Sequence, residues 1–224
     1  DFIHLPEGNS RINVKVKHGD ETEINGQGPV ITEEAINELF AKLDTLTKED
    51  ILVLAGSIPN TLPEDIYEKI LASLESKGIR VVVDATKDLL LNVLKYHPFL
   101  IKPNNHELGE MFGTVCKTDE DIVHYAKKLQ EKGAVNVLIS MAGDGAILIT
   151  EDGQNIKMGT PKGKVVNSVG AGDSMVAGFI TGYIRGGNYE EALKSGTAAG
   201  SATAFSEGLA SLEMYEKMLK QITE

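Results

Sequence analysis

One segment of the sequence combines two glycines with a carboxylate at the start of a helical pattern. Gly170 and Gly172 stand directly before Asp173 in the stretch Val-Gly-Ala-Gly-Asp-Ser at 169–174. Because glycine lacks a Cβ, backbone N–H groups in such a turn can approach an anion, and the helix dipole adds positive potential. A first-turn carboxylate could then deprotonate a hydroxyl that attacks a phosphoryl group. This pattern is typical of phosphoryl transfer, although an ordinary strand-to-helix turn with a stabilising acid has the same spacing.

Two motifs that would direct attention elsewhere are absent from the sequence. No Gly-x4-Gly-Lys-Ser/Thr segment is present, which excludes a P-loop enzyme. Residues 106–110 (HELGE) match only half of a zinc-protease motif, and none of the five His residues stands in a metal-ligand pattern. The turn before Asp173 is therefore the main candidate for chemistry.

Short apolar runs alternate with helical patterns along most of the chain. The runs at 51–55, 79–84, 99–101 and 135–141 are typical of strands covered on both faces. Helical patterns separate them, at 32–43, 63–77, 87–94, from about 105, and from 118 to 132. We expect three short β segments at 146–150, 155–159 and 165–166, then helices at 171–184, 189–205 and 212–222. The alternation predicts an α/β fold with a doubly wound, mostly parallel sheet flanked by helices.

The segment before this core has a different period. Residues 11–17 alternate apolar and polar side chains, which predicts a half-buried strand, and residues 21–25 can return beside it. The two strands predict a small hairpin with one polar face and one apolar face.

Composition limits the classes of partner. The chain has 224 residues, a formal net charge of −11 and 42% hydrophobic residues, which is ordinary for a globular protein. The acidic balance argues against a nucleic-acid binder, and no apolar run is long enough to span a membrane. The single Cys116 cannot form an internal disulfide, so we expect a reducing, cytoplasmic setting.

Several segments together resemble one enzyme family. Residues 169–174 followed by 176–179 resemble the C-terminal motif of the ribokinase-like PfkB carbohydrate kinases. Five more segments occur in family order, at 11–16, 23–29, 56–59, 102–107 and 140–146. The resemblance implies a ribokinase-like core over 30–224 and part of a β-hairpin lid over 1–29.

The resemblance also implies an activity. The branch of the family with these motifs phosphorylates fructose 1-phosphate at its C6 hydroxyl, using ATP and Mg²⁺, with Asp173 as general base. The backbone of Gly170, Ala171 and Gly172 would form the anion hole. Phosphorylation of tagatose 6-phosphate and a non-catalytic, nucleotide-binding relative are the alternatives; a pure binder would not need Asp173.

The family's binding residues carry over by position, each beside a plainer interpretation. Arg11 would grip the sugar's existing phosphate, or be an exposed charge, and Gly56 and Ser57 would contact the sugar or only form a turn. Asn104 and Glu107 would place Mg²⁺ through water, or cap a helix. The ATP contacts implied are Lys102, Asn104, Ser140, Gly143, Gly145, Gly172, Gly196, Gly200 and Ser201. Lys102 could equally be a surface lysine, and Gly196 and Gly200 could serve helix packing.

Three features depart from the family pattern, and a fourth extends it. Ala142 replaces the first glycine of the nucleotide-binding element, and Asn167 stands where some members hold a monovalent cation with an acid. The family's opening strand and its Gly-Gly-Lys-Gly segment have no counterpart, so a chain that truly began at Asp1 would be expected to show little or no catalysis. The hairpin implies a homodimer formed through the lid.

Overall fold

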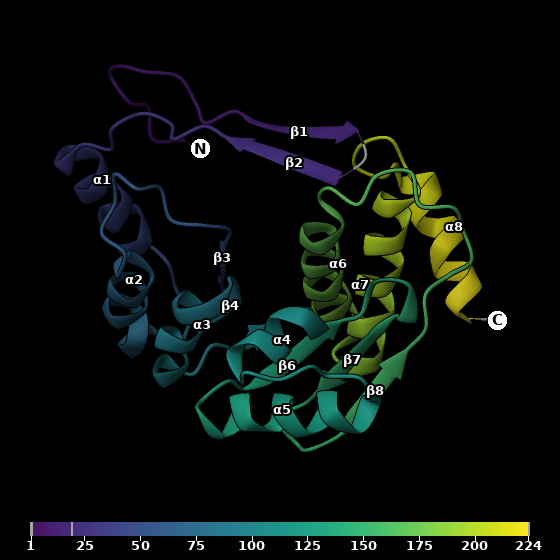
Figure 1. Cartoon of the computed structure of the whole chain (residues 1–224). Coiled ribbons are helices and arrows are strands. Elements are labelled where there is room, and N and C mark those ends of the chain that lie inside the picture. Colours follow the sequence, from purple (N-terminus) through teal and green to yellow (C-terminus); the bar gives the residue numbers. More distant parts are fainter. Residues whose placement is uncertain (1, 19, 224) are drawn as a thin grey trace. The chain divides into compact units, whose positions relative to one another are not determined.

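The computed structural model describes residues 2–18 and 20–223, and the chain separates into two compact units (Figure 1). The first unit comprises residues 1–52 and 56–80, and the second comprises 53–55 and 81–224. Within the described residues, no helix has the length and apolar character needed to cross a bilayer.

The first unit contains a hairpin and a pair of helices. Its elements are β1 (Asn13–His18), β2 (Asp20–Asn25), α1 (Glu33–Asp44), α2 (Ile66–Leu74) and the 3-10 helix η1 (Glu75–Lys77). The Thr32 hydroxyl accepts from the amide of Ala35 at 3.2 Å, which caps α1 as the sequence predicts. Buried side chains of both helices form the apolar core, namely Leu43, Ile66, Ile70, Leu71 and Leu74.

The hairpin pairs its strands in antiparallel register. Val14 lies opposite Ile24, so these side chains share one face with Ile12 and Val16, two residues away on either side. Ile12 is 70% exposed and Ile24 is 61% exposed. The predicted apolar face therefore exists and is open to solvent in the single chain.

The larger sheet has six strands. Its order is β3 (Ile51–Ala55), β4 (Arg80–Asp84), β5 (Leu100–Ile101), β6 (Asn136–Ser140), β7 (Ala146–Ile149) and β8 (Asn155–Met158). Strands β4, β5 and β6 are parallel, whereas β7 is antiparallel to β6 and β8 is antiparallel to β7. The expected strand at 165–166 is wrong: the amide of Val166 instead donates to the carbonyl of Ala204 at 2.8 Å, outside any strand.

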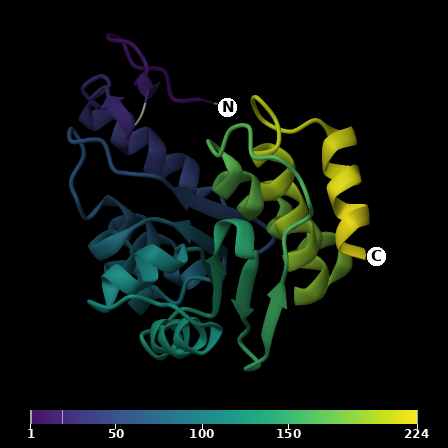
Figure 2. The ribbon, with the colours of Figure 1, turned by 45° about the vertical axis from the view of Figure 1, so that its right-hand side comes forward.

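Helices cover both faces of the sheet in the second unit, as the alternating pattern predicts. They are α3 (Lys87–Val93), η2 (Leu94–Tyr96), α4 (Asn105–Met111), α5 (Asp119–Glu131), η3 (Ala142–Asp144), α6 (Ala171–Gly186), α7 (Tyr189–Ala204) and α8 (Leu212–Thr223). Figure 2 shows the teal helices α4 and α5 on one side of strands β7 and β8, and the green to yellow helices α6–α8 on the other. This arrangement confirms the doubly wound fold, and it sets the start of α6 at the end of a long loop after β8.

Candidate active site

The turn before α6 leaves amide groups without partners. Gly170 precedes the helix with φ 78°, a left-handed conformation that favours glycine. The amide of Ala171 donates to the carbonyl of Ser168 at 3.2 Å. Among the residues that the structure describes, the amides of Gly172 and Asp173 have no acceptor. The Ala171 amide, one of the three expected in the anion hole, is therefore engaged inside the turn. The amides of Gly172 and Asp173, in the first turn of α6, remain to bind an anion.

A buried ion pair lies beside this turn. Lys102 Nζ is 3.2 Å from Asp84 Oδ2, and the two side chains are only 7% and 20% exposed. Asp84 ends β4, and Lys102 follows the neighbouring parallel strand β5. A Cβ built on Gly172 would lie 3.3 Å from Lys102 Nζ. The interpretation of Lys102 as a surface lysine is thus wrong, and its ammonium adjoins the start of α6.

Three carboxylates share this region with the one ammonium. Burial raises the pKa of Asp84, the Lys102 ammonium opposes this rise, and the charges of Asp173 and Glu107 add to it. The four groups come from four separate segments of the chain. Sequence reasoning gave no role to Asp84, although its place at the carboxyl end of an apolar parallel strand is where such folds gather functional groups.

Asn104 and Glu107 form a capping box at the start of α4. Asn104 Oδ1 accepts from the amides of His106 at 2.9 Å and Glu107 at 2.8 Å, and Glu107 Oε2 accepts from the amide of Asn104 at 2.8 Å. The helix-cap interpretation is therefore realised in the structure. Asn104 also forms an isolated parallel bridge with Ser140, which brings another predicted ATP residue next to this cap.

The charges fit a divalent cation that arrives with a nucleotide. Within the described part of the chain, no three His, Cys, Asp or Glu side chains are arranged to hold a metal ion by themselves. Mg²⁺ usually keeps several waters and is bound by one or two carboxylates together with substrate phosphates. The excess of carboxylates around Lys102 suits such an ion. The metal contacts of Asn104 and Glu107 through water stay predictions.

Packing accounts for only one of the two glycines in the segment after β6, Gly143 and Gly145. A Cβ on Gly145, whose φ is 94°, would meet the carbonyl oxygen of Met158 at 1.9 Å, so packing alone requires glycine there. Ala142 adopts φ 48°, the left-handed region that favours the glycine it replaces. Nothing lies within 4 Å of a Cβ built on Gly143, so packing does not require glycine there. The predicted contact of Gly143 with the nucleotide stays a prediction.

The glycines of α7 pack against α6. A Cβ on Gly196 would lie 2.9 Å from the carbonyl oxygen of Met175, and one on Gly200 would lie 3.1 Å from that of Ala171. Ser201 is buried at 7% exposure. Helix packing is thus the role that these contacts support, and Gly200 places α7 directly against the turn before α6. Nucleotide contacts of Gly196, Gly200 and Ser201 stay predictions.

In the first unit, two predicted substrate residues meet. Arg11 Nη1 donates to Ser57 Oγ at 3.0 Å, and Arg11 Nε donates to Asn13 Oδ1 at 2.8 Å. Gly56 has φ 85°, and its carbonyl accepts from the Tyr67 hydroxyl at 3.3 Å. Among the residues that the structure describes, two neutral oxygens accept hydrogen bonds from the exposed guanidinium and orient it.

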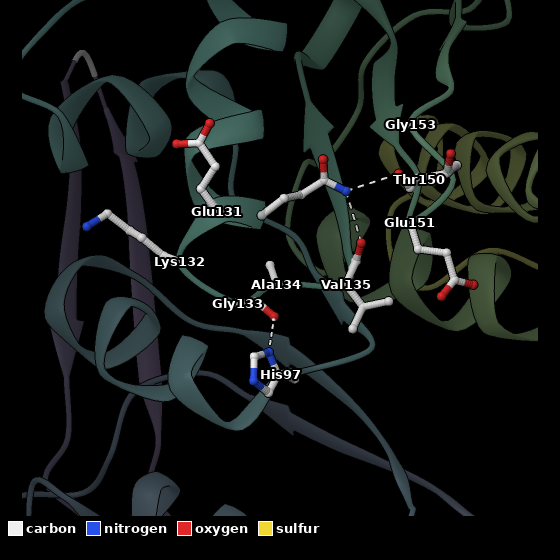
Figure 3. A pocket seen from close by; sticks show the side chains of 10 residues that line it. His97, Glu131, Lys132, Gly133, Ala134, Val135, Thr150, Glu151 and Gly153 are labelled. Carbon is white, nitrogen blue, oxygen red and sulfur yellow. Dashed lines mark hydrogen bonds between the residues drawn. The ribbon is translucent and has the colours of Figure 1, made fainter.

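A cavity of about 500 Å³ lies elsewhere in the second unit (Figure 3). Its lining includes His97, Gly133 and Val135, before the first residue of β6, whereas Ser140 ends that strand beside the capping box. His97 Nδ1 lies 3.0 Å from the carbonyl oxygen of Gly133. The cavity therefore belongs to the opposite end of β6 from the candidate active site.

Comparison with known proteins decides the family. The model of the pfkB family carbohydrate kinases matches residues 1–214. The chain belongs to the pfkB family. A 1-phosphofructokinase of Bacillus subtilis is 51% identical over 215 residues, which cover 96% of this chain and 71% of that protein. A D-tagatose-1-phosphate kinase of Bacillus licheniformis is 37% identical and covers 99% of this chain, with 73% of that protein matched.

A solved structure agrees with these relatives. The crystal structure of a provisionally named phosphofructokinase from Staphylococcus aureus has a TM-score of 0.88 and 45% identity, over 99% of this pfkB chain and 72% of that one. Family and relatives together identify the chain as a sugar-phosphate kinase. Both the predicted fold class and the predicted enzyme class are thereby confirmed.

Proposed function

We propose that this kinase transfers the γ-phosphoryl group of ATP to the C6 hydroxyl of fructose 1-phosphate. The observation that carries the proposal is the Lys102–Asp84 pair beside Gly172 and Asp173, in a chain 51% identical to a 1-phosphofructokinase. Phosphoryl transfer depends mainly on positioning and on neutralising charge. A fixed ammonium, free first-turn amides and a carboxylate in one region are the groups that this reaction needs.

In the proposed mechanism, Asp173 accepts the proton of the attacking hydroxyl. The amides of Gly172 and Asp173 and the N-terminal dipole of α6 stabilise charge on the transferred group. Lys102 contacts the nucleotide phosphates, and its ion pair with Asp84 fixes its direction. Asn104 and Glu107 would hold Mg²⁺ through water, and the bound ion would neutralise negative charge on the phosphates.

On the substrate side, Arg11 is proposed to bind the phosphate that the sugar already carries. Its forked guanidinium can donate two parallel hydrogen bonds to a phosphate, and Ser57 keeps the fork oriented. Both groups belong to the first unit. Ser57 and Gly56 would also contact the sugar.

Product analysis tests the proposal. The protein is purified, and its intact mass shows whether the family's opening segment precedes Asp1. It is incubated with ATP, Mg²⁺ and fructose 1-phosphate, and ADP release is followed by a coupled assay. For a protein that includes that segment, we expect ADP release that depends on fructose 1-phosphate, with fructose 1,6-bisphosphate as the product. The proposal is overturned if such a protein binds ATP but releases no ADP in the presence of this acceptor.

A second acceptor follows from the similarity to the B. licheniformis protein. Tagatose 1-phosphate differs from fructose 1-phosphate at one ring carbon, and the tagatose 6-phosphate expected from the family resemblance carries its phosphate elsewhere. A substrate panel separates the three by the ratio of kcat/KM. A larger kcat/KM for either tagatose phosphate would replace the first proposal without changing the roles of Asp173 and Lys102.

The hairpin supports a proposal about assembly. Ile12, Val14, Val16 and Ile24 are 44% to 70% exposed on one face. Covering this face with the same face of a second copy would bury the apolar surface, so we propose a cytoplasmic homodimer formed through the hairpin. Sedimentation equilibrium of the wild type and of Val14→Lys tests it; a wild-type monomer at micromolar concentration would contradict it.

A further inference from the structure

The turn at residues 168–173, which leads into α6, is hydrogen-bonded to a second segment, which connects α7 and α8. The Asn167 side chain reaches both. Its Nδ2 donates to the carbonyl of Glu207 at 3.0 Å, and its Oδ1 accepts from the amide of Val169 at 3.2 Å. The backbone amide of Asn167 also lies 3.2 Å from the carbonyl oxygen of Ala204. One amide side chain therefore joins the backbone of the turn to the backbone of the 204–207 segment.

A hydroxyl pair forms a second link, between the first turn of α6 and the last turn of α7. Ser174 Oγ lies 2.8 Å from Thr203 Oγ1, and Thr203 Oγ1 also accepts from the amide of Ala210 at 3.3 Å. Ser174 directly follows Asp173 in the first turn of α6. A Cβ on Gly170 would lie 3.1 Å from Leu209 Cδ2, so the turn packs closely on this segment.

We propose that Asn167 and Thr203 are positioning residues, which hold the turn of Gly172 and Asp173 in the geometry needed for phosphoryl transfer. The inference rests on the proposed function, because it assigns to these residues the placement of the proposed base and anion hole. Neither residue touches the reacting groups. Displacements of about 1 Å at a reacting centre can cost roughly 100-fold in rate, so modest hydrogen bonds behind the turn can have large kinetic effects.

The chemistry of the Asn167 contact provides a selective test. Asn167→Asp keeps an oxygen to accept from Val169 but replaces the donor to Glu207 with a second acceptor. A carboxylate oxygen would then face a carbonyl oxygen at the distance of the lost hydrogen bond. These two acceptors repel each other unless a cation lies between them, which predicts that potassium ions partly restore the variant.

The experiment compares four variants of the full chain with the wild type. Asn167→Asp and Thr203→Val each remove one link, Thr203→Ser retains the hydroxyl, and Glu207→Ala removes a side chain while keeping its backbone carbonyl. We measure kcat and KM for both substrates, ATP affinity by calorimetry, and hydrogen exchange of peptides that cover 168–174.

We expect kcat to fall roughly 10-fold or more in Asn167→Asp and Thr203→Val, with the KM of the sugar phosphate within about twofold. Exchange in the 168–174 peptides should accelerate in the same two variants. Thr203→Ser and Glu207→Ala should stay within about twofold of wild type. Potassium chloride, but not choline chloride at equal ionic strength, should raise kcat of Asn167→Asp.

Two results would overturn the inference. One is a kcat within twofold of wild type in both link variants, with unchanged exchange over 168–174. The other is a loss of kcat that only follows the fraction of unfolded protein, because this would make the links structural alone. The variant Asp173→Asn distinguishes a failure of this inference from a failure of the proposed function. If that variant keeps wild-type turnover, the proposed function fails, whatever the link variants show.

Discussion

The groups proposed to handle the nucleotide and those proposed to handle the sugar phosphate are held in different ways. Lys102 and Asp84 are a nearly buried pair: Asp84 ends one strand of the main sheet, and Lys102 follows the neighbouring strand. Arg11 is exposed and is oriented by hydrogen bonds to Ser57 and Asn13. In the proposed mechanism, the transferring phosphoryl group would meet residues that belong to the core, whereas the phosphate already on the sugar would meet a surface cation. Changes to the first region should therefore affect stability and catalysis together, and changes to the second should affect substrate binding alone.

The largest expected effect on stability comes from Lys102→Met. The substitution removes the cation that pairs with Asp84, whose carboxylate is poorly exposed and lies near two further carboxylates. We expect this to lower the free energy of unfolding by about 3 kcal/mol. Urea denaturation measures this loss. The double variant Lys102→Met/Asp84→Asn is the control and should recover part of the stability. Equal losses in the single and double variants would show that packing, not charge, explains the effect.

Arg11→Ala should raise the KM for fructose 1-phosphate by roughly 10- to 100-fold, the range expected for hydrogen bonds to a charged group. The free energy of unfolding should change by less than about 0.5 kcal/mol, because the side chain is exposed. Steady-state kinetics and urea denaturation measure the two quantities. Arg11→Lys keeps the charge but not the forked guanidinium, and its KM should lie between that of the wild type and that of Arg11→Ala. A KM that Arg11→Ala leaves unchanged would remove Arg11 from the substrate site.

The raised pKa of Asp84 predicts a pH dependence of stability. Because the folded state holds this proton more tightly than the unfolded state, the folded protein binds more protons between the ordinary Asp value of 3.8 and the raised value. Stability contributed by this group is therefore lost as pH rises through that interval. The free energy of unfolding of wild type minus that of Asp84→Asn should decrease from about pH 4 upward. A difference that increases with pH would contradict the raised pKa.

The smallest expected effect belongs to Ala142→Gly. A left-handed conformation costs an L-residue about 1–2 kcal/mol, and glycine's greater freedom in the unfolded chain offsets about 0.5–1 kcal/mol of this. We therefore expect the variant to be more stable by up to about 1.5 kcal/mol, measured as a rise in Tm. A lower Tm would show that the Ala142 side chain makes contacts that outweigh the backbone strain.

Much of the fold was predictable because its signals are local. The apolar runs that became β4 and β6 have buried residues throughout their centres, and Asn104 and Glu107 have the spacing of a capping box that the structure forms. The pairing of Asp84 with Lys102 was not predictable, because it depends on which strands become neighbours in the sheet. Sequence spacing likewise could not show that the Ala171 amide donates to the carbonyl of Ser168, or that Gly196 and Gly200 face α6.

The proposed base is tested most directly by comparing Asp173→Asn with wild type for both turnover and ATP binding. The substitution keeps the size of the side chain and removes its ability to accept a proton from the hydroxyl. We predict that kcat falls by roughly 100- to 10,000-fold, while the Kd for ATP with Mg²⁺ changes by less than about threefold. A variant that retains wild-type kcat, or one that loses ATP affinity in proportion to its rate, would contradict the assignment of Asp173 as the base.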